Sequence, residues 1–73
     1  MRAVKSNSIK DIATVIVFDS EFPDFFDSVS CEGKIFSVLP SHGYGDNAIA
    51  VKGKYDFNGK NVSFLHNGKT VKQ

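Results

Sequence analysis

Two Asn-Gly pairs, Asn58-Gly59 and Asn67-Gly68, lie in the carboxyl-terminal third of this 73-residue chain. Asn-Gly is the preferred pair for the centre of a type I′ turn, because both central residues of that turn take positive φ. Each pair therefore predicts a tight hairpin with a two-residue loop. The two hairpins in series predict a three-stranded antiparallel meander that begins near Ala48.

The two turns also fix the register of this meander. The expected cross-strand pairs are Phe57 with Lys60, Tyr55 with Val62, Lys54 with Ser63, Lys52 with Leu65, Leu65 with Thr70, and Phe64 with Val71. One face then gathers the apolar side chains of Val51, Tyr55, Phe57, Val62, Phe64 and Val71. The other face gathers Lys52, Lys54, Asp56, Asn61, Ser63, Thr70 and Lys72, with Leu65 as its one apolar member. This separation of polarity supports the register.

Two apolar stretches upstream of the meander predict further strands. Residues 14–18 are apolar on both faces, which suits a central strand or one that is covered on both faces. Residues 35–39 predict another strand, which Pro40 ends. Residues 8–12 fit either a helical turn, with Ser8 and Asp11 imitating a capping box, or the extension of a strand.

Residues 22–31 carry two conflicting patterns. Phe22, Phe25, Phe26 and Val29 have the i, i+3, i+4, i+7 spacing of a short amphipathic helix. The following Glu32-Gly33 pair could instead close a hairpin that places Val29 opposite Phe36, with a strand over 27–31. Both alternatives stay open, and one helical turn at 23–27 followed by a short strand would satisfy parts of each.

The number of short strands and tight turns indicates a mainly β fold. We expect a small five- to six-stranded antiparallel barrel or roll, of SH3-like or OB-like size, with at most one or two short helical turns. No linker or repeat divides the chain, so residues 1–73 are expected to form a single β-rich domain. A core of this size supplies only about 3–5 kcal/mol of net stability, so binding to a partner or to a second copy is a source of more.

The net charge of +1 hides a division of the chain into three blocks. Residues 1–18 carry a balance of +2, residues 19–46 a balance of −5, and residues 47–73 a balance of +4. The acidic middle could lie near the basic ends of the same fold or of a second copy. Alternatively, the blocks are an acidic patch and a basic patch that serve different partners.

Targeting signals are not recognisable in the sequence. The apolar run 13–18 is far shorter than the about 20 residues of a membrane-spanning helix, and no signal-peptide pattern follows Met1. We therefore expect a cytoplasmic protein with no membrane association.

Residues that could support catalysis or metal binding are few and scattered. Nucleophilic catalysis would have to use Cys31 with His42 or His66, and no orienting carboxylate is recognisable. His42 and Asp46 share a glycine-containing loop, but a metal site there would need a third ligand. No phosphate-binding or dinucleotide-binding motif occurs. We expect a protein that is not an enzyme and that has no cofactor and no metal.

Residues 19–27 combine three phenylalanines with four acidic residues. If all three rings fold inward, the segment closes the hydrophobic core, and its acidic side chains are solvated on either side. If Phe25 or Phe26 stays exposed, the ring is an anchor surrounded by charge, as in protein-binding hot spots. The candidate partner-binding residues are Asp19, Glu21, Phe22, Asp24, Phe25, Phe26 and Asp27, together with His42 and Tyr44 of the neighbouring glycine loop.

The leading hypothesis is a small protein-interaction module that binds another protein through this segment. Inhibitors and adaptors are common among chains of this size, and an inhibitor carried by a phage or mobile element would fit. A first alternative is a weak nucleic-acid binder with a lysine-lined sheet face made of Lys52, Lys54, Lys60, Lys69 and Lys72. Lysines at such positions also keep an outer face soluble and protect a sheet edge. A second alternative is a subunit of a homo-oligomer held by acidic-to-basic docking.

Overall fold

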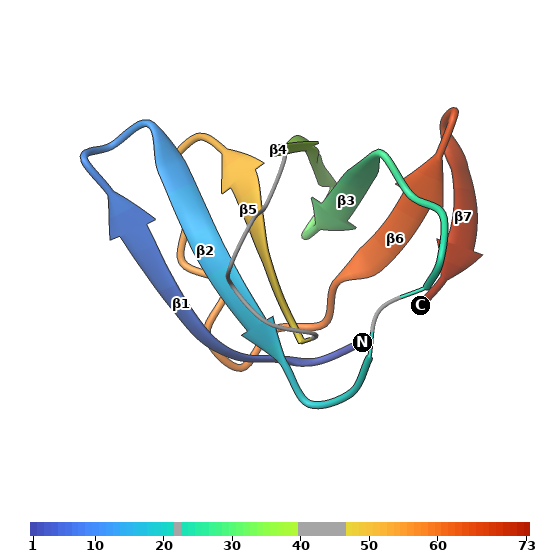
Figure 1. Cartoon of the computed structure of the whole chain (residues 1–73), viewed down its shortest axis with the longest axis horizontal. Helices are drawn as coiled ribbons and strands as arrows, with labels where there is room; N and C mark the ends of the chain where they lie inside the picture. The colour runs from blue at the N-terminus through green and yellow to red at the C-terminus, as the bar shows by residue number, and fades with distance from the viewer. Residues whose placement is uncertain (22, 40–46) are drawn as a thin grey trace.

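The computed structural model describes residues 1–21, 23–39 and 47–73, and these residues form one antiparallel β-sheet without a helix (Figure 1). The strands are β1 (Ala3–Ile9), β2 (Ala13–Phe18), β3 (Ser28–Cys31), β4 (Lys34–Leu39), β5 (Ala48–Lys52), β6 (Ser63–His66) and β7 (Lys69–Lys72). Their order in the sheet is β1-β2-β5-β4-β3-β6-β7. The prediction of a mainly β fold is confirmed. The described part has seven strands instead of five to six, and its sheet does not close into a barrel.

Strand β4 joins the two halves of the sheet. Its first part, residues 34–37, pairs with β3, whereas Val38 and Leu39 pair with β5. The sheet bends along this strand, so that β1, β2 and β5 face β3 and β6 across the interior (Figure 1). Backbone hydrogen bonds also join residues 1–3 to residues 59–62, just before β6. The termini of the chain therefore lie close to the same strand.

Three hairpins have positive φ at both central residues, as a type I′ turn requires. Glu32-Gly33 joins β3 to β4 and places Val29 opposite Phe36, which confirms that alternative of the prediction. The helical alternative, including a single helical turn at 23–27, is wrong, because the described residues 23–27 have no helical turn. The pair Lys10-Asp11 lies in the turn that joins β1 to β2, so of residues 8–12 only residues 8 and 9 extend a strand, and residues 10–12 form a hairpin turn and not a helical one. This turn contains no glycine and was therefore not recognised in the sequence.

The predicted meander is only half correct. Asn67-Gly68 joins β6 to β7 with Leu65 opposite Thr70, as expected. However, β5 pairs with β2 and β4 and not with β6, and residues 54–57 lie outside the strands. Gly53, at a φ of 101°, leads the chain out of β5 in a backbone conformation that glycine tolerates best. The apolar β5 is thereby buried between two apolar strands, which removes more apolar surface from water than an outer hairpin could.

The second half of the meander also departs from the expected register. Phe64 lies opposite Lys72, because a bulge shifts the pairing of β6 with β7. Val71 consequently stays 47% exposed, although the alternation placed it on the apolar face. Leu65, expected as a lone exposed leucine, is only 6% exposed.

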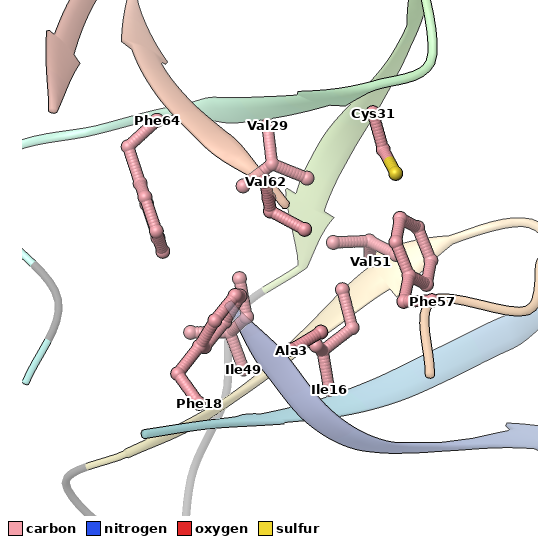
Figure 2. Close-up of a cluster of buried hydrophobic side chains, with 10 residues drawn as sticks. All are labelled: Ala3, Ile16, Phe18, Val29, Cys31, Ile49, Val51, Phe57, Val62 and Phe64. Atoms are coloured by element: carbon pink, nitrogen blue, oxygen red, sulfur yellow. The ribbon is translucent and has the colours of Figure 1, made fainter. Parts of the chain in front are cut away.

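The core lies between the two halves of the sheet (Figure 2). Its buried side chains are Ala3, Ile16, Phe18, Val29, Cys31, Ile49, Val51, Phe57, Val62 and Phe64. Strand β2 pairs on both sides, with β1 and β5, which confirms residues 14–18 as a central strand. Cys31 packs here as a small apolar side chain, and burial raises the pKa of its thiol. No described residue belongs to a long apolar helix that could cross a membrane.

Candidate functional site

The segment 19–27 connects β2 to β3 and runs beside the β6–β7 hairpin (Figure 1). Its phenylalanines separate into two environments. Phe26 is half-buried, and its ring meets the ring of Phe64 edge-on, with 4.9 Å between the centroids. Phe25 is 76% exposed, more than any other large apolar side chain of the described residues. The third one, Phe22, lies outside the described residues.

Both ends of this segment are attached to the β6–β7 hairpin. At one end, the backbone N–H of Asp27 donates to the carbonyl oxygen of Leu65 at 2.9 Å, and the N–H of Asn67 donates to the Asp27 carboxylate at 3.0 Å. At the other end, Lys72 Nζ donates to the carbonyl oxygen of Glu21 at 3.3 Å. The segment thus bridges the hairpin between two fixed points, with Phe25 between them.

Asp27 has a structural role in this arrangement. Its carboxylate accepts hydrogen bonds from the Asn67 N–H and from the Ser28 hydroxyl, at 3.0 Å each. These bonds lower the pKa of Asp27, with the Asn67 N–H as the main cause. His66 Nδ1 lies 3.8 Å from the same carboxylate. Asp27 is therefore ionised at neutral pH and holds the end of the segment in place.

The remaining acidic residues of the segment point to solvent. Asp19, Glu21 and Asp24 are exposed, and none forms an ion pair with a described residue. Asp24 is the chain neighbour of the exposed Phe25, whereas Asp19 lies in the groove at the start of the chain, where its charge acts on the Met1 ammonium. His42 and Tyr44, which were predicted to bind the partner, lie outside the described residues. Asp46, considered above as a metal ligand with His42, also lies outside them.

The lysine-lined face predicted as an alternative site is not continuous. A cross-strand row of Lys54, Ser63 and Lys72 would need β5 to pair with β6, which it does not. Lys54 Nζ instead lies 3.0 Å from an Asp11 carboxylate oxygen, and Lys60 Nζ lies 3.0 Å from Glu32. The other three lysines are exposed, with Lys52 on β5 and Lys69 and Lys72 on the distant β7. Two of the five lysines of the predicted face thus form ion pairs within the chain.

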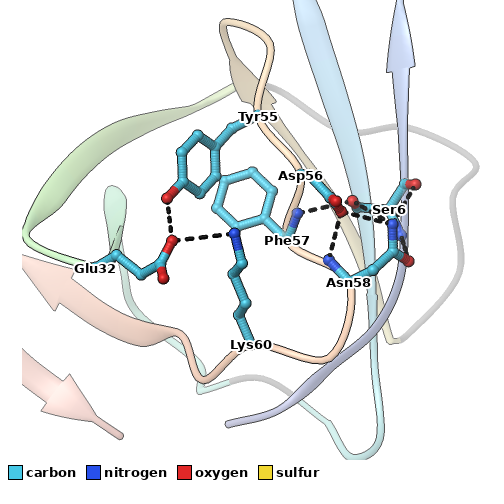
Figure 3. Close-up of polar contacts among 7 residues, drawn as sticks. All are labelled: Ser6, Glu32, Tyr55, Asp56, Phe57, Asn58 and Lys60. Carbon is cyan, nitrogen blue, oxygen red and sulfur yellow. Dashed lines mark hydrogen bonds and ion pairs between the residues drawn. The ribbon is translucent and has the colours of Figure 1, made fainter.

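No pattern in the sequence predicts the polar cluster around Tyr55 (Figure 3). The Tyr55 hydroxyl donates to the Glu32 carboxylate, which also pairs with Lys60. The ammonium groups of Lys34 and Lys60 lie 5.1 and 4.8 Å from the centroid of the Tyr55 ring. These contacts lower the pKa of Glu32 and raise that of Lys60. The cluster ties the β3–β4 turn to the chain that follows β5, so its charges serve the fold.

Other places that could hold a ligand are shallow or incomplete. An open groove of about 610 Å³ lies between the start of the chain and the end of β7, with Arg2, Lys72 and Asp19 in its lining. Among the described residues, no three His, Cys, Asp or Glu side chains come together as a metal ion would require. Comparisons with protein-family models, with curated proteins and with solved structures find no match for this chain.

Proposed function

We propose that this chain is a non-enzymatic protein-interaction module that binds another protein through the acidic segment 19–27, with Phe25 as the anchor. The proposal rests on the exposure of Phe25, whose chain neighbour Phe26 instead packs against the core residue Phe64. Burial of apolar surface is favourable by about 25 cal/mol per Å², so a partner that covers this ring gains affinity directly. Hot spots of binding are large side chains that become fully desolvated near the centre of an interface, and a phenylalanine ring can fill such a pocket.

The attachment of the segment at both ends supports this role. Hydrogen bonds that join Glu21 and Asp27 to the β6–β7 hairpin restrain these two residues, on either side of Phe25, before a partner arrives. A preordered segment loses less conformational entropy on binding than a free loop. Phe25 is thus presented on a fixed support.

The charge around Phe25 defines the chemistry of the partner. Asp19, Glu21 and Asp24 favour a surface with an apolar pocket and a rim of lysine or arginine. A module of this kind would act as an inhibitor if it covers the active site or a binding surface of its partner. It would act as an adaptor if it links two partners. Our proposal keeps the expectation of a cytoplasmic protein, of which a phage or mobile-element inhibitor of a host protein is one form.

The test compares Phe25→Ala with Ile35→Ala as baits in an affinity capture from the native host. Ile35 is 69% exposed on β4, so its truncation removes a similar amount of exposed apolar surface at a different place. A captured protein should then be purified and its affinity measured by calorimetry. We expect Phe25→Ala to weaken binding by at least about 30-fold, as for a hot-spot residue, and Ile35→Ala to leave it unchanged.

Circular dichroism and urea unfolding control for the fold of both variants. A partner that binds Phe25→Ala as tightly as the unmodified chain would contradict the proposal. Equal loss of binding in the two variants would contradict it as well, because the effect would then not be specific to the segment.

A further inference from the structure

A second exposed apolar site lies at the turn between β1 and β2. Ile9 and Ile12 flank the Lys10-Asp11 pair and are 40% and 67% exposed. The N–H of Ile12 donates to the carbonyl oxygen of Ile9 at 3.0 Å, which holds the turn closed. Two branched apolar side chains thus stand in solvent at the tip of one hairpin.

Lysines from two parts of the chain lie near these isoleucines along the backbone and across the sheet. Ile9 lies opposite Ala13, and Ala13 lies opposite Lys52, so the three form one row across β1, β2 and β5. The N–H of Gly53 donates to the carbonyl oxygen of Ile12 at 2.9 Å, which brings residues 52–54 beside the turn. Lys10, Lys52 and Lys54 against Asp11 leave a balance of +2 (three minus one). We call residues 9–12 and 52–54 the Ile12 surface.

The Ile12 surface and the acidic segment 19–27 are complementary in chemistry. One carries the exposed Ile9 and Ile12 among residues with a net charge of +2, and the other carries the exposed Phe25 in a segment with four carboxylates. They lie toward opposite ends of the long axis of the molecule, with β1 and β2 at one end and the β6–β7 hairpin at the other (Figure 1). Because the segment is attached to that hairpin at Glu21 and Asp27, it cannot reach the Ile12 surface of its own chain.

We infer that the Ile12 surface is a docking site for the Phe25 segment of a second copy of this chain. The inference rests on the proposed function, because it takes Phe25 as the anchor. Contact between two like surfaces would oppose carboxylates to carboxylates or lysines to lysines, whereas head-to-tail contact pairs opposite charges. Each copy keeps one unused surface in such a contact, so the copies assemble into a ring or an open chain.

Analytical ultracentrifugation of the full chain tests self-association. We expect the mass to rise with protein concentration at low salt and to fall toward the monomer near 1 M salt, where the Debye length is about 3 Å. The variants Phe25→Ala and Ile12→Ser should each be monomeric at concentrations at which the unmodified chain assembles. Ile35→Ser, at an equally exposed isoleucine, should assemble normally.

Mixing the two monomeric variants gives the sharpest result. Phe25→Ala keeps an intact Ile12 surface, and Ile12→Ser keeps an intact Phe25 segment, so an equimolar mixture has one functional contact and should stop at the dimer. A charge pair gives an independent check: Lys52→Glu should weaken assembly at least tenfold, whereas Lys69→Glu, the same change on β7, should not weaken it. Circular dichroism shows whether each variant is folded.

The inference is overturned if the unmodified chain is monomeric at all concentrations, if Ile12→Ser assembles normally, if Ile35→Ser loses assembly to the same degree, or if the mixture forms no dimer. These outcomes leave the proposed function standing as long as a different protein still binds in a Phe25-dependent way. Assembly and partner binding that are both unaffected by Phe25→Ala would overturn the inference and the proposed function together.

Discussion

The turns Asn67-Gly68 and Asn58-Gly59 share a dipeptide but differ in structure. At the first, Asn67 and Gly68 have φ values of 51° and 80°, and the chain folds back as the β6–β7 hairpin. At the second, only Gly59 has a positive φ, of 74°, and the segments before and after the turn do not pair with each other as strands. The Lys60 N–H still donates to the Phe57 carbonyl oxygen at 3.0 Å, so a turn forms, but it does not join two paired strands.

The Asn58 side chain explains the difference. Its Oδ1 accepts the N–H of Ser6 at 2.9 Å, and its Nδ2 donates to the carbonyl oxygen of Ser6 at 3.3 Å, so the amide pairs with β1 as a neighbouring strand would (Figure 3). Next to it, the N–H of Gly59 donates to the carbonyl oxygen of Ala3 at 2.8 Å. The Asn58 turn therefore covers the outer edge of β1, a place where strands otherwise attract unwanted pairing. The same dipeptide serves a local hairpin in one place and a distant sheet edge in the other.

Replacement of each asparagine by glycine should separate the two roles most strongly. We expect Asn58→Gly to destabilise the fold by about 1–3 kcal/mol, because it leaves the Ser6 N–H without its acceptor. Asn67→Gly should change stability by no more than about 0.5 kcal/mol, because glycine tolerates positive φ. Urea unfolding at neutral pH measures both. Equal effects of the two replacements would show that the turns do not differ in the way the contacts indicate.

Replacement of each glycine by alanine should show what the turns have in common. Gly59 and Gly68 have φ values of 74° and 80°, and a Cβ at either position would meet open space. Strain of the left-handed backbone is then the only cost, and we expect about 1–2 kcal/mol for both Gly59→Ala and Gly68→Ala. Thermal unfolding checks this. A loss at one position only would mean that the other turn relaxes to a different backbone conformation.

The smallest expected effect is the loss of stability at low pH, because a carboxylate accepts hydrogen bonds from each turn. Asp56 accepts the N–H and the side-chain Nδ2 of Asn58, at 3.0 and 2.8 Å, and Asp27 accepts the N–H of Asn67. These bonds lower the pKa of both carboxyl groups below the ordinary value of 3.8. A lowered pKa in the folded state means that the stabilisation is present above the unfolded pKa and is lost as the pH falls through the folded pKa.

NMR titration of the side-chain carboxyl carbons should therefore place the midpoints of Asp27 and Asp56 below 3.8. The double variant Asp27→Asn, Asp56→Asn should lose less stability than the unmodified chain between about pH 5 and pH 2. The effect should be modest, because both groups are exposed to solvent. Midpoints at or above 3.8 would mean that the two carboxylates do not hold their turns in solution.

Short-range features of the fold were accessible from the sequence. The strands at 14–18 and 35–39, the Glu32-Gly33 hairpin and the Asn67-Gly68 hairpin follow from apolar patterning and turn chemistry within about ten residues. The partners of β5 were not accessible. Pairing of β5 with β2 joins residues far apart in the sequence, and several apolar strands compete for the same neighbour.

At the candidate site, too, local features could be predicted from the sequence and long-range contacts could not. The sequence located residues 19–27 and their charge, but it could not tell which phenylalanine faces the core. Phe25 and Phe26 are neighbours of the same residue type, and it is in the tertiary structure that Phe26 packs against Phe64 while Phe25 stays exposed. Lys54 pairs with Asp11, and Lys60 pairs with Glu32. Both ion pairs depend on the tertiary fold, and they argue against the predicted lysine face as a binding surface.

By itself, the sequence determined that the chain is mainly β, where the Asn67-Gly68 hairpin turns, and that an acidic, phenylalanine-rich segment lies between its strands. Patterning of apolar side chains and the positive φ of turn residues are local properties, so they can be recognised without neighbours. Only the tertiary structure decided the order of the strands, the use of Asn58 at the edge of β1, and the exposure of Phe25 and Ile12. Each of these depends on which distant surfaces are buried together, and that choice is made by the packing of the whole chain.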